Sequence, residues 1–404
     1  MDLFDKCNRF TRAKELMAQG LFPYFRALSA NESTRARVNG RDMVMVGSNN
    51  YLGLTHDPRV VEAAVKATET FGTSCTGSRF LNGTLELHEE LERRLAKFLN
   101  KESALVFSTG FQANLGAISS IVGKGDVIFC DRENHASIID GCRLSFGEIR
   151  KFRHDDMADL ERLLEQTPKS SGKLIIIDGV FSMTGSITNL PGIVRLAKAH
   201  GARILLDDAH GLGTLGETGR GTMEHFDLLA SGENEIDIVT GTFSKSLASL
   251  GGFVAGREDV IHYIKHVART LIFSASCTPA STAAALASLK ILEKEPWRVN
   301  RLNTISKRVR ASLSGLGYDT MGSATPIIPV LIGDDTETFL FWKSLDDRGV
   351  FANPVVPPAT PPGKGLIRTS YMATHEDRDI DQVINAFTEL ADFETRPSAL
   401  NAHA

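Results

Sequence analysis

The feature that most constrains this chain is a series of short apolar runs that alternate with amphipathic segments between residues 102 and about 255. Strands that are apolar along both faces belong to sheets covered on both sides, and helices between such strands make the sheet largely parallel. The sequence therefore predicts an α/β fold with a mainly parallel central sheet. The expected strands are SALVFST, DVIFCD, EIRKF, KLIIIDGVFS, ARILLDDAH, DIVTGTFSK and GGFVAG, and the expected helices between them are FQANLGAISSIV, ADLERLLEQT and LPGIVRLAKAHG.

The rest of the 404-residue chain divides around this central part. Apolar spacing predicts helices over residues 4–19, 57–71 and 88–100, and two more within 258–295, EDVIHYIKHVA and then STAAALASLKILE. A smaller C-terminal α+β part should follow, with PIIPVLIG and LIRTSY as strands and the proline-rich PVVPPATPPGKG as a loop. We therefore expect an N-terminal segment over 1–50, a large domain over 51–290 and a C-terminal domain over 291–404.

Charge and composition argue against several classes of function. A formal net charge of -4 does not suit a nucleic-acid binder that works through bulk charge. Five widely spaced cysteines without a C-x-x-C motif argue against a disulfide framework or structural zinc. The N-terminus is charged from the start, and no apolar run is as long as a membrane span. We expect a cytoplasmic protein without a transmembrane segment.

The polar residues that follow each apolar run are the candidates for chemistry, because parallel sheets bind ligands beyond the carboxyl ends of their strands. After SALVFST, Gly110 and Phe111 open a helix whose free N–H groups could bind a phosphate, although many such turns bind nothing. His135 follows DVIFCD. It is either an ordinary loop histidine or an imidazole that lies against an aromatic cofactor.

The segment ARILLDDAHGLG ends in two acids and a histidine. A carboxylate that directly terminates an apolar strand is costly unless it is paired or functional. Asp207 could keep a pyridine nitrogen protonated, which makes the ring an electron sink. A metal site of Asp207, Asp208 and His210 is the alternative, but further ligands are not clustered nearby. The glycines of 211–216 spell G-x-G-x-x-G without opening a helix, so we reject a dinucleotide site.

Lys245 lies at the end of DIVTGTFSK, between Ser244 and further small residues. A lysine in a tight, partly apolar turn can have a lowered pKa and form a Schiff base, and nearby hydroxyls suit a phosphate. An arbitrary loop lysine is usually solvated. Here Asp207, His135 and the Gly-Phe turn all lie at strand ends of the same expected sheet. Together these residues predict a pyridoxal 5'-phosphate (PLP) enzyme with Lys245 as the Schiff-base lysine.

Arg368 lies within an apolar strand of the C-terminal part, in LIRTSY. An arginine expected to be buried, without an acid nearby in sequence, suggests a bidentate clamp for a carboxylate. An ion pair across a domain interface is the alternative.

Seven segments, taken in order and spacing, resemble the α-oxoamine synthases of the fold-type I (aspartate aminotransferase-like) PLP enzymes. The resemblance covers about residues 4–393. It implies a mainly parallel central sheet with a smaller C-terminal α+β domain, and a homodimer whose active sites are built from both chains. The segments are NYLGL, GSRFLNGTLELHEELE, STGFQAN, NHAS, DDAHGLG, GTFSKSLASLGG and PPATPPGKGLIRTS.

The resemblance also implies catalytic roles. Lys245 would hold PLP and later remove the α-proton of the substrate. His135 would stack on the PLP ring and contact the amino-acid carboxylate. Asp207 would bond the pyridinium nitrogen, and His210, helped by Ser182, the phenolic oxygen.

The remaining candidates are implied to bind the phosphate or the substrate. Ser274 would reach the phosphate of the partner chain across the dimer interface, whereas Asn50 and Arg368 would act near the substrate carboxylate. The phosphate ligands within one chain would be Gly110, Phe111, Thr242 and Ser244.

Members of this family condense an amino acid with an acyl-CoA thioester and release CO2. FDKCNRF, GLFPYFRAL, SRFLNGTLELH and FSKSLASLGGFVAG are most similar to the members that join L-serine and palmitoyl-CoA. This implies 3-oxosphinganine, CoA and CO2 as products, in the first step of sphingolipid synthesis. One departure is SMTGSITNL, which lacks the acidic residue that many members carry after Ser-Met.

Other functions stay open. Within the family these are 8-amino-7-oxononanoate synthase, glycine C-acetyltransferase, 5-aminolevulinate synthase or another aminoketone synthase. Outside it, a PLP aminotransferase or lyase would share Lys245 and Asp207. A non-catalytic dimer partner is disfavoured because Lys245, Asp207 and His135 are all present. Peripheral membrane contact for a lipid product is compatible with the sequence.

Overall fold

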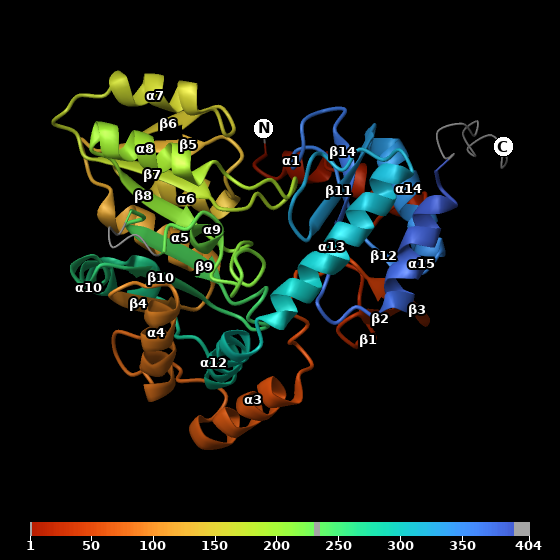
Figure 1. Cartoon of the computed structure of the whole chain (residues 1–404), viewed down its shortest axis with the longest axis horizontal. Helices are drawn as coiled ribbons and strands as arrows, with labels where there is room; N and C mark the ends of the chain where they lie inside the picture. The colour runs from red at the N-terminus through yellow and green to blue at the C-terminus, as the bar shows by residue number, and fades with distance from the viewer. Residues whose placement is uncertain (1, 230–234, 392–404) are drawn as a thin grey trace.

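The computed structural model describes residues 2–229 and 235–391. Residues 392–404, the end of the expected C-terminal domain, lie outside the described residues. Figure 1 shows a large sheet flanked by helices in one half of the molecule, and a smaller group of strands and helices, mostly from the C-terminal third, in the other. The buried side chains form two large clusters beside the large sheet and a third around the C-terminal elements.

The large sheet is built from the seven segments that the sequence predicts as strands. In spatial order these are β4 (Ser103–Phe107), β10 (Gly252–Gly256), β9 (Ile238–Thr242), β8 (Arg203–Asp207), β7 (Lys173–Asp178), β5 (Val127–Asp131) and β6 (Glu148–Phe152). β10 is antiparallel to β4 and β9, and the other neighbouring pairs are parallel. The mainly parallel sheet is confirmed, and GGFVAG supplies its antiparallel strand.

Helices cover both faces of this sheet, which explains why its inner strands are largely apolar, whereas the edge strand β6 is mostly exposed and carries charged residues. In β7, Ile175 and Ile177 pack into one core and Ile176 into the opposite one, because successive side chains of a strand point to opposite faces. On the face of Ile176 lie α5 (Gly110–Ile121), α6 (Ala136–Leu144), α10 (Glu258–Val267) and α11 (Arg269–Ile272). On the other face lie α4 (Glu86–Phe98), α7 (Met157–Glu165), α8 (Leu190–His200) and α12 (Pro279–Lys294).

Two further helices accompany this half of the molecule. α3 (Pro58–Phe71) packs against α12, and the side chain of Asp57 caps it by accepting from the Arg59 N–H. The short α9 (Thr222–His225) follows the glycine-rich loop 211–216, which does not open a helix at its end. This loop agrees with our rejection of a dinucleotide-binding site at residues 211–216.

The smaller half of the molecule is here called the C-terminal half, because most of it comes from the last third of the chain. It contains an antiparallel sheet of β11 (Ile327–Gly333), β14 (Gly365–Ser370) and β13 (Asn353–Val355), with helices α13 (Trp297–Gly315), α14 (Asp335–Asp347) and α15 (Asp377–Thr388). The proline-rich segment predicted as a loop begins inside β13 and ends on the first residue of β14, so that prediction was wrong for Pro354, Val355 and Gly365. Pro354 is tolerated because β13 is an edge strand, where a missing N–H breaks no ladder.

The N-terminal segment joins this C-terminal half through a second small sheet. Its strands are β1 (Ala30–Asn31), β2 (Arg35–Val38), β3 (Arg41–Met45) and β12 (Val350–Phe351). β12 pairs in parallel with β3, so residues separated by about 300 positions share one ladder. Tyr51, which follows β3, is fully buried in the core around α13 and β14.

One helix prediction differs from the structure, and several helices were not predicted. The helix expected over residues 4–19 is two short ones, α1 (Asp5–Asn8) and α2 (Arg12–Ala18), neither of which buries a side chain that would support a longer helix. The helices not predicted individually are α6, α9, α11, α13, α14 and α15. Among the described residues, no helix combines the length and apolar character needed to cross a membrane.

Candidate active site

A cavity of about 240 Å³ lies at the carboxyl ends of β4, β5, β7, β8 and β9, where the parallel strands all end at one edge of the sheet. The predicted residues that line it are Gly110, Phe111, His135, Ser182, Asp207, His210, Thr242, Ser244 and Lys245. Asn114, Ser137, Asp178 and Gly251 line it too and were not predicted. The sheet thus brings together nine candidates that lie up to 135 residues apart between Gly110 and Lys245.

Lys245 lies in a closed loop that follows β9. Its carbonyl oxygen accepts from the Ala248 N–H (3.0 Å), and the Ser249 N–H donates to the Phe243 carbonyl (2.9 Å). The lysine is half-buried in the cavity wall. Burial lowers its pKa to about 8, although Asp207 opposes this shift. A useful fraction of the amine is therefore neutral, and nucleophilic, near neutral pH.

Asp207 ends β8 and is 5% exposed. Its Oδ2 accepts from Asn114 Nδ2 (2.7 Å), and its Oδ1 accepts from the Ala209 N–H (3.1 Å). The Asn114 amide also donates to Ser137 Oγ (2.9 Å) and accepts from Thr240 Oγ1 (2.7 Å). These bonds hold the carboxylate in one orientation at the cavity.

Asp178 is a second buried acid of the cavity, which the sequence reasoning missed. It is paired with Asp207 in the register of β7 and β8. Burial, together with the neighbouring Asp207, raises its pKa well above the ordinary range. Asp178 ends the apolar run KLIIID as Asp207 ends RILLD, so the same signal in the sequence could have found it.

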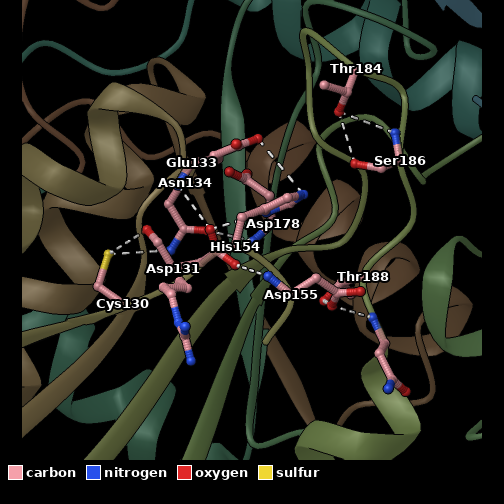
Figure 2. Close-up of polar contacts among 12 residues, drawn as sticks. Cys130, Asp131, Glu133, Asn134, His154, Asp155, Asp178, Thr184, Ser186 and Thr188 are labelled. Atoms are coloured by element: carbon pink, nitrogen blue, oxygen red, sulfur yellow. Dashed lines mark hydrogen bonds and ion pairs between the residues drawn. The ribbon is translucent and has the colours of Figure 1, made fainter. Parts of the chain in front are cut away.

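Asp178 also fixes the turn that carries His135. Its Oδ2 accepts from the His135 backbone N–H (2.7 Å), and its own N–H donates to Asn134 Oδ1 (3.0 Å). Asn134 Nδ2 in turn donates to the Ile176 carbonyl (2.8 Å) and contacts Cys130 Sγ (3.3 Å). Figure 2 shows Asn134, Asp178 and Cys130 in this arrangement. The ends of β5 and β7 are thereby linked through side chains.

His135 caps α6 and borders the cavity. Its Nδ1 accepts from the Ser137 N–H (3.3 Å) and lies 2.8 Å from Ser137 Oγ. Burial lowers the pKa of its imidazole, which favours the neutral ring. Its ring meets Phe111 edge-on, with centroids 6.4 Å apart. The face of this neutral ring that Phe111 does not contact is suited to contact with a flat aromatic ligand.

The start of α5 forms a cradle suited to an anion. Thr109 caps the helix by accepting from the Gln112 N–H (3.1 Å), and the first N–H groups of a helix have no acceptor within it. A Cβ on Gly110 would lie 2.8 Å from Thr242 Cβ, and one on Gly252 would lie 2.4 Å from Gly110 Cα. Only glycines let the helix end approach β9 and β10 this closely. The Thr242 and Ser244 hydroxyls, 2.8 Å apart, complete the cradle.

Arg368 lies behind the cavity wall and is 5% exposed. Its Nε donates to the Ser182 carbonyl (2.6 Å), and its Nη2 donates to Asn49 Oδ1 (3.0 Å). Within residues 2–229 and 235–391 it makes no ion pair. The structure therefore gives no support to the ion-pair alternative for this arginine, and its role as a carboxylate clamp stays a prediction.

Two other predicted residues do not line the cavity. The amide of Asn50 bonds within its own neighbourhood, to Thr55 Oγ1 (2.8 Å), Ser33 Oγ (3.1 Å) and the Leu54 N–H (3.0 Å). Ser274 Oγ accepts from Gln112 Nε2 (3.0 Å), in the first turn of α5. The neighbouring Asn49, rather than Asn50, contacts Arg368.

The metal-site alternative does not fit this arrangement. Asp208 is turned away to accept from the Thr222 N–H (2.7 Å) and hydroxyl (2.6 Å). No group of three possible metal ligands occurs in the part of the chain that the structure describes. The cavity instead presents Lys245, the two acids Asp178 and Asp207, and the imidazoles of His135 and His210 around an anion cradle.

Comparisons with known proteins agree on one relationship. The family model of aminotransferase class I and II matches residues 41–387. The serine palmitoyltransferase of Bacteriovorax stolpii is 50% identical over 387 residues, 96% of this chain and 91% of the relative. An 8-amino-7-oxononanoate synthase of Thermoanaerobacter pseudethanolicus is 41% identical over 380 residues, 94% of this chain and 95% of the relative. A solved structure of SPT (serine palmitoyltransferase) with PLP as an internal aldimine has a TM-score of 0.93 at 36% identity, covering 98% of this chain and 99% of that one.

Proposed function

Because this chain belongs to the class I and II aminotransferase family, we propose that it is a PLP-dependent acyltransferase that condenses L-serine with palmitoyl-CoA. The products would be 3-oxosphinganine, CoA and CO2. The fold is that of the fold-type I PLP transferases, as the sequence predicted. The observation that carries the proposal is the similarity along nearly the whole chain to serine palmitoyltransferase, 50% identity against 41% for the 8-amino-7-oxononanoate synthase.

The cavity residues fit PLP. An anion cradle at the start of α5 matches a phosphate, and the glycine at position 110 lets the Thr242 side chain lie directly against the start of this helix. Asp207 would face the ring nitrogen and His135 the ring surface, with Lys245 beside the aldehyde. His210, together with Ser182, would meet the phenolic oxygen. Each group has the charge or hydrogen-bonding capacity that its part of PLP requires.

When bound, PLP supplies an aldehyde for the amino group of the substrate and a cationic ring that draws electrons from Cα. The fixed carboxylate of Asp207 would hold a proton on the ring nitrogen. Lys245, whose amine becomes neutral as the pH rises through about 8, would take the proton from the substrate Cα. His135 and Arg368 would orient the substrate carboxylate, which later leaves as CO2.

We propose a homodimer that places Ser274 at the phosphate of the partner chain. The segment that carries Ser274 is tied to loop 77–85, because the Ser276 N–H donates to the Gly77 carbonyl (2.9 Å). The hydroxyls of Ser78 and Ser276 are buried without a hydrogen-bond partner within the described residues. Large apolar side chains on these segments and at the cavity rim are exposed. They are Phe80, Leu81, Leu250 and Phe273.

A matrix of substrates tests which amino acid and which thioester the protein uses. Serine, alanine, glycine and threonine are each combined with short, medium and long acyl-CoAs, and free CoA is measured. We expect serine with palmitoyl-CoA to give the highest kcat/KM. Preference for alanine with a pimeloyl thioester would favour 8-amino-7-oxononanoate synthase instead. If no acyl-CoA gives free CoA while an amino acid is consumed, the protein is an aminotransferase or lyase.

The lowered pKa of Lys245 predicts how PLP capture depends on pH. A lysine with a pKa of about 8, instead of the ordinary 10.5, becomes neutral as the pH rises through about 8. Since the neutral amine is the nucleophile, the rate of covalent capture by cofactor-free protein should rise about tenfold per pH unit below that pKa and level off above it. Stopped-flow absorbance measures this rate. A rate that still climbs steeply near pH 10 would contradict the prediction.

A further inference from the structure

Tyr51 is a fully buried tyrosine that the sequence reasoning did not single out as a site residue, yet it contacts the cavity histidine directly. Its hydroxyl lies 2.7 Å from His210 Nδ1, and the two rings meet edge-on with centroids 6.0 Å apart. Tyr51 belongs to the core of the C-terminal half, whereas His210 follows β8 of the large sheet. The contact therefore joins the two halves of the molecule at the cavity.

Both groups keep their neutral forms. Burial raises the pKa of Tyr51 to about 12, so the hydroxyl retains its proton. Burial, together with the cationic Lys245 and Arg368 and with His135, lowers the pKa of His210 well below its ordinary value, so the imidazole carries one proton. That proton sits either on Nδ1, facing Tyr51, or on Nε2.

The hydrogen bonds around Tyr51 favour the second arrangement. With a proton on Nδ1, the tyrosine would have to donate elsewhere, and the nearby acceptor is Asn49 Oδ1 at 3.3 Å. This distance exceeds the usual 2.5–3.0 Å for hydroxyl donors. Asn49 Oδ1 also receives a charge-assisted hydrogen bond from Arg368 Nη2 (3.0 Å). At 2.7 Å, His210 Nδ1 is the better acceptor for the tyrosine proton.

We propose that Tyr51 is a positioning residue that donates to His210 Nδ1 and thereby holds His210 as the Nε2–H tautomer. The tautomer of a histidine is set by the hydrogen bond that its other nitrogen makes. The Nε2–H then serves as a fixed donor for an oxygen anion in the cavity. That the anion is the phenolic oxygen of PLP rests on the proposed function, whereas the tautomer itself does not.

The chain of contacts explains why the donor stays in place. Arg368 donates to Asn49, Tyr51 lies between Asn49 and His210, and Arg368 also donates to the Ser182 carbonyl at the cavity. The tyrosine ring is fully buried and so cannot turn away from His210 without disturbing the core.

The tautomer can be measured in the full-length protein without cofactor. Protein with 15N-labelled histidine gives pyridine-like shifts for bare ring nitrogens and pyrrole-like shifts for protonated ones, and the His210→Asn variant identifies the signals. We expect a pyridine-like Nδ1 and a pyrrole-like Nε2 for His210 in the unmodified protein. A pyrrole-like Nδ1 would overturn the proposal, whatever reaction the protein catalyses.

The Tyr51→Phe variant tests the role of the hydroxyl. We expect a mixture of His210 tautomers, about tenfold weaker binding of PLP, and a shifted pH for the colour change of the bound cofactor. Tyr371→Phe is the matched control, because Tyr371 is equally buried in the same core but packs against His375. The control should leave the His210 signals unchanged. Unchanged His210 signals in Tyr51→Phe would refute the role of Tyr51.

Discussion

Replacing Lys245 with alanine is expected to lower the rate of CoA release by more than about 10³-fold. A positioned general base alone contributes roughly 10²–10⁴ in rate, and this lysine is proposed to supply the covalent link to PLP as well. Its position at the cavity and its pKa of about 8 support both roles. The measurements are CoA release with serine and palmitoyl-CoA, and the visible absorption of the purified protein before and after borohydride.

A second lysine of this chain, Lys101, serves as the control for whether a lowered pKa alone makes a lysine react with PLP. Burial also lowers the pKa of Lys101 to about 8, but Lys101 lies beside Glu102 and does not line the cavity. Borohydride reduction followed by peptide mapping should label Lys245 and leave Lys101 unlabelled. Labelling of Lys101, or a Lys245→Ala protein that still releases CoA at the full rate, would remove Lys245 from the proposed mechanism.

Replacing Asp207 with asparagine is expected to cause the second large loss. Asparagine keeps the shape and can still accept from Asn114, but it cannot hold a cationic ring nitrogen. Removing one partner of a buried ion pair costs about 3–5 kcal/mol. At about 1.4 kcal/mol per factor of ten, this corresponds to a fall of roughly 10²–10⁴ in kcat/KM. Steady-state CoA release measures it.

The adjacent acid gives a matched control for this variant. Asp208 is also buried, and burial raises its pKa to about 6, but its carboxylate accepts from Thr222 away from the cavity. Asp208→Asn should lower the midpoint of thermal unfolding without changing the visible absorption of bound PLP. Equal losses of kcat/KM in the two variants would mean that Asp207 acts through folding rather than through the ring nitrogen.

Much of the site was predictable because one rule applies to every parallel strand. Polar residues that follow buried strands meet at a single edge of the sheet, so His135, Asp207 and Lys245 could be grouped before their distances were known. The same rule applied to KLIIID would have added Asp178. Asp178 was not predicted, because the apolar Val180 and Phe181 that follow it make the run look as if it continues to Ser182.

Asn114 and Tyr51 could not be found in this way. Asn114 lies inside α5, where a polar residue in a helix normally faces solvent, and only the packing of α5 on the sheet brings its amide to Asp207. Tyr51 looks like an ordinary aromatic core residue. Its contact with His210 depends on how the N-terminal segment, paired with β12, is placed against the large sheet.

The secondary structure shows the same division. All seven strands of the large sheet were predicted, and burial on both faces explains the apolar runs of the inner strands, such as β5, β7 and β8, but not the charged edge strand β6. The antiparallel direction of β10 was not, since an apolar run carries no sign of its direction. The extent of α1 and α2 was overestimated because apolar spacing indicates a helix only if some partner buries that face.

The sequence by itself determined the sheet, the edge at which chemistry takes place and the family to which the chain belongs, because these follow from local runs of residues and their order. Only the tertiary structure decided which groups hold the catalytic side chains: Asn114 on Asp207, Asp178 on the turn of His135, and Tyr51 on His210. Hydrogen bonds of this kind form between segments distant in the chain, over less than 3 Å. Their partners are therefore set by packing and leave no local pattern in the sequence.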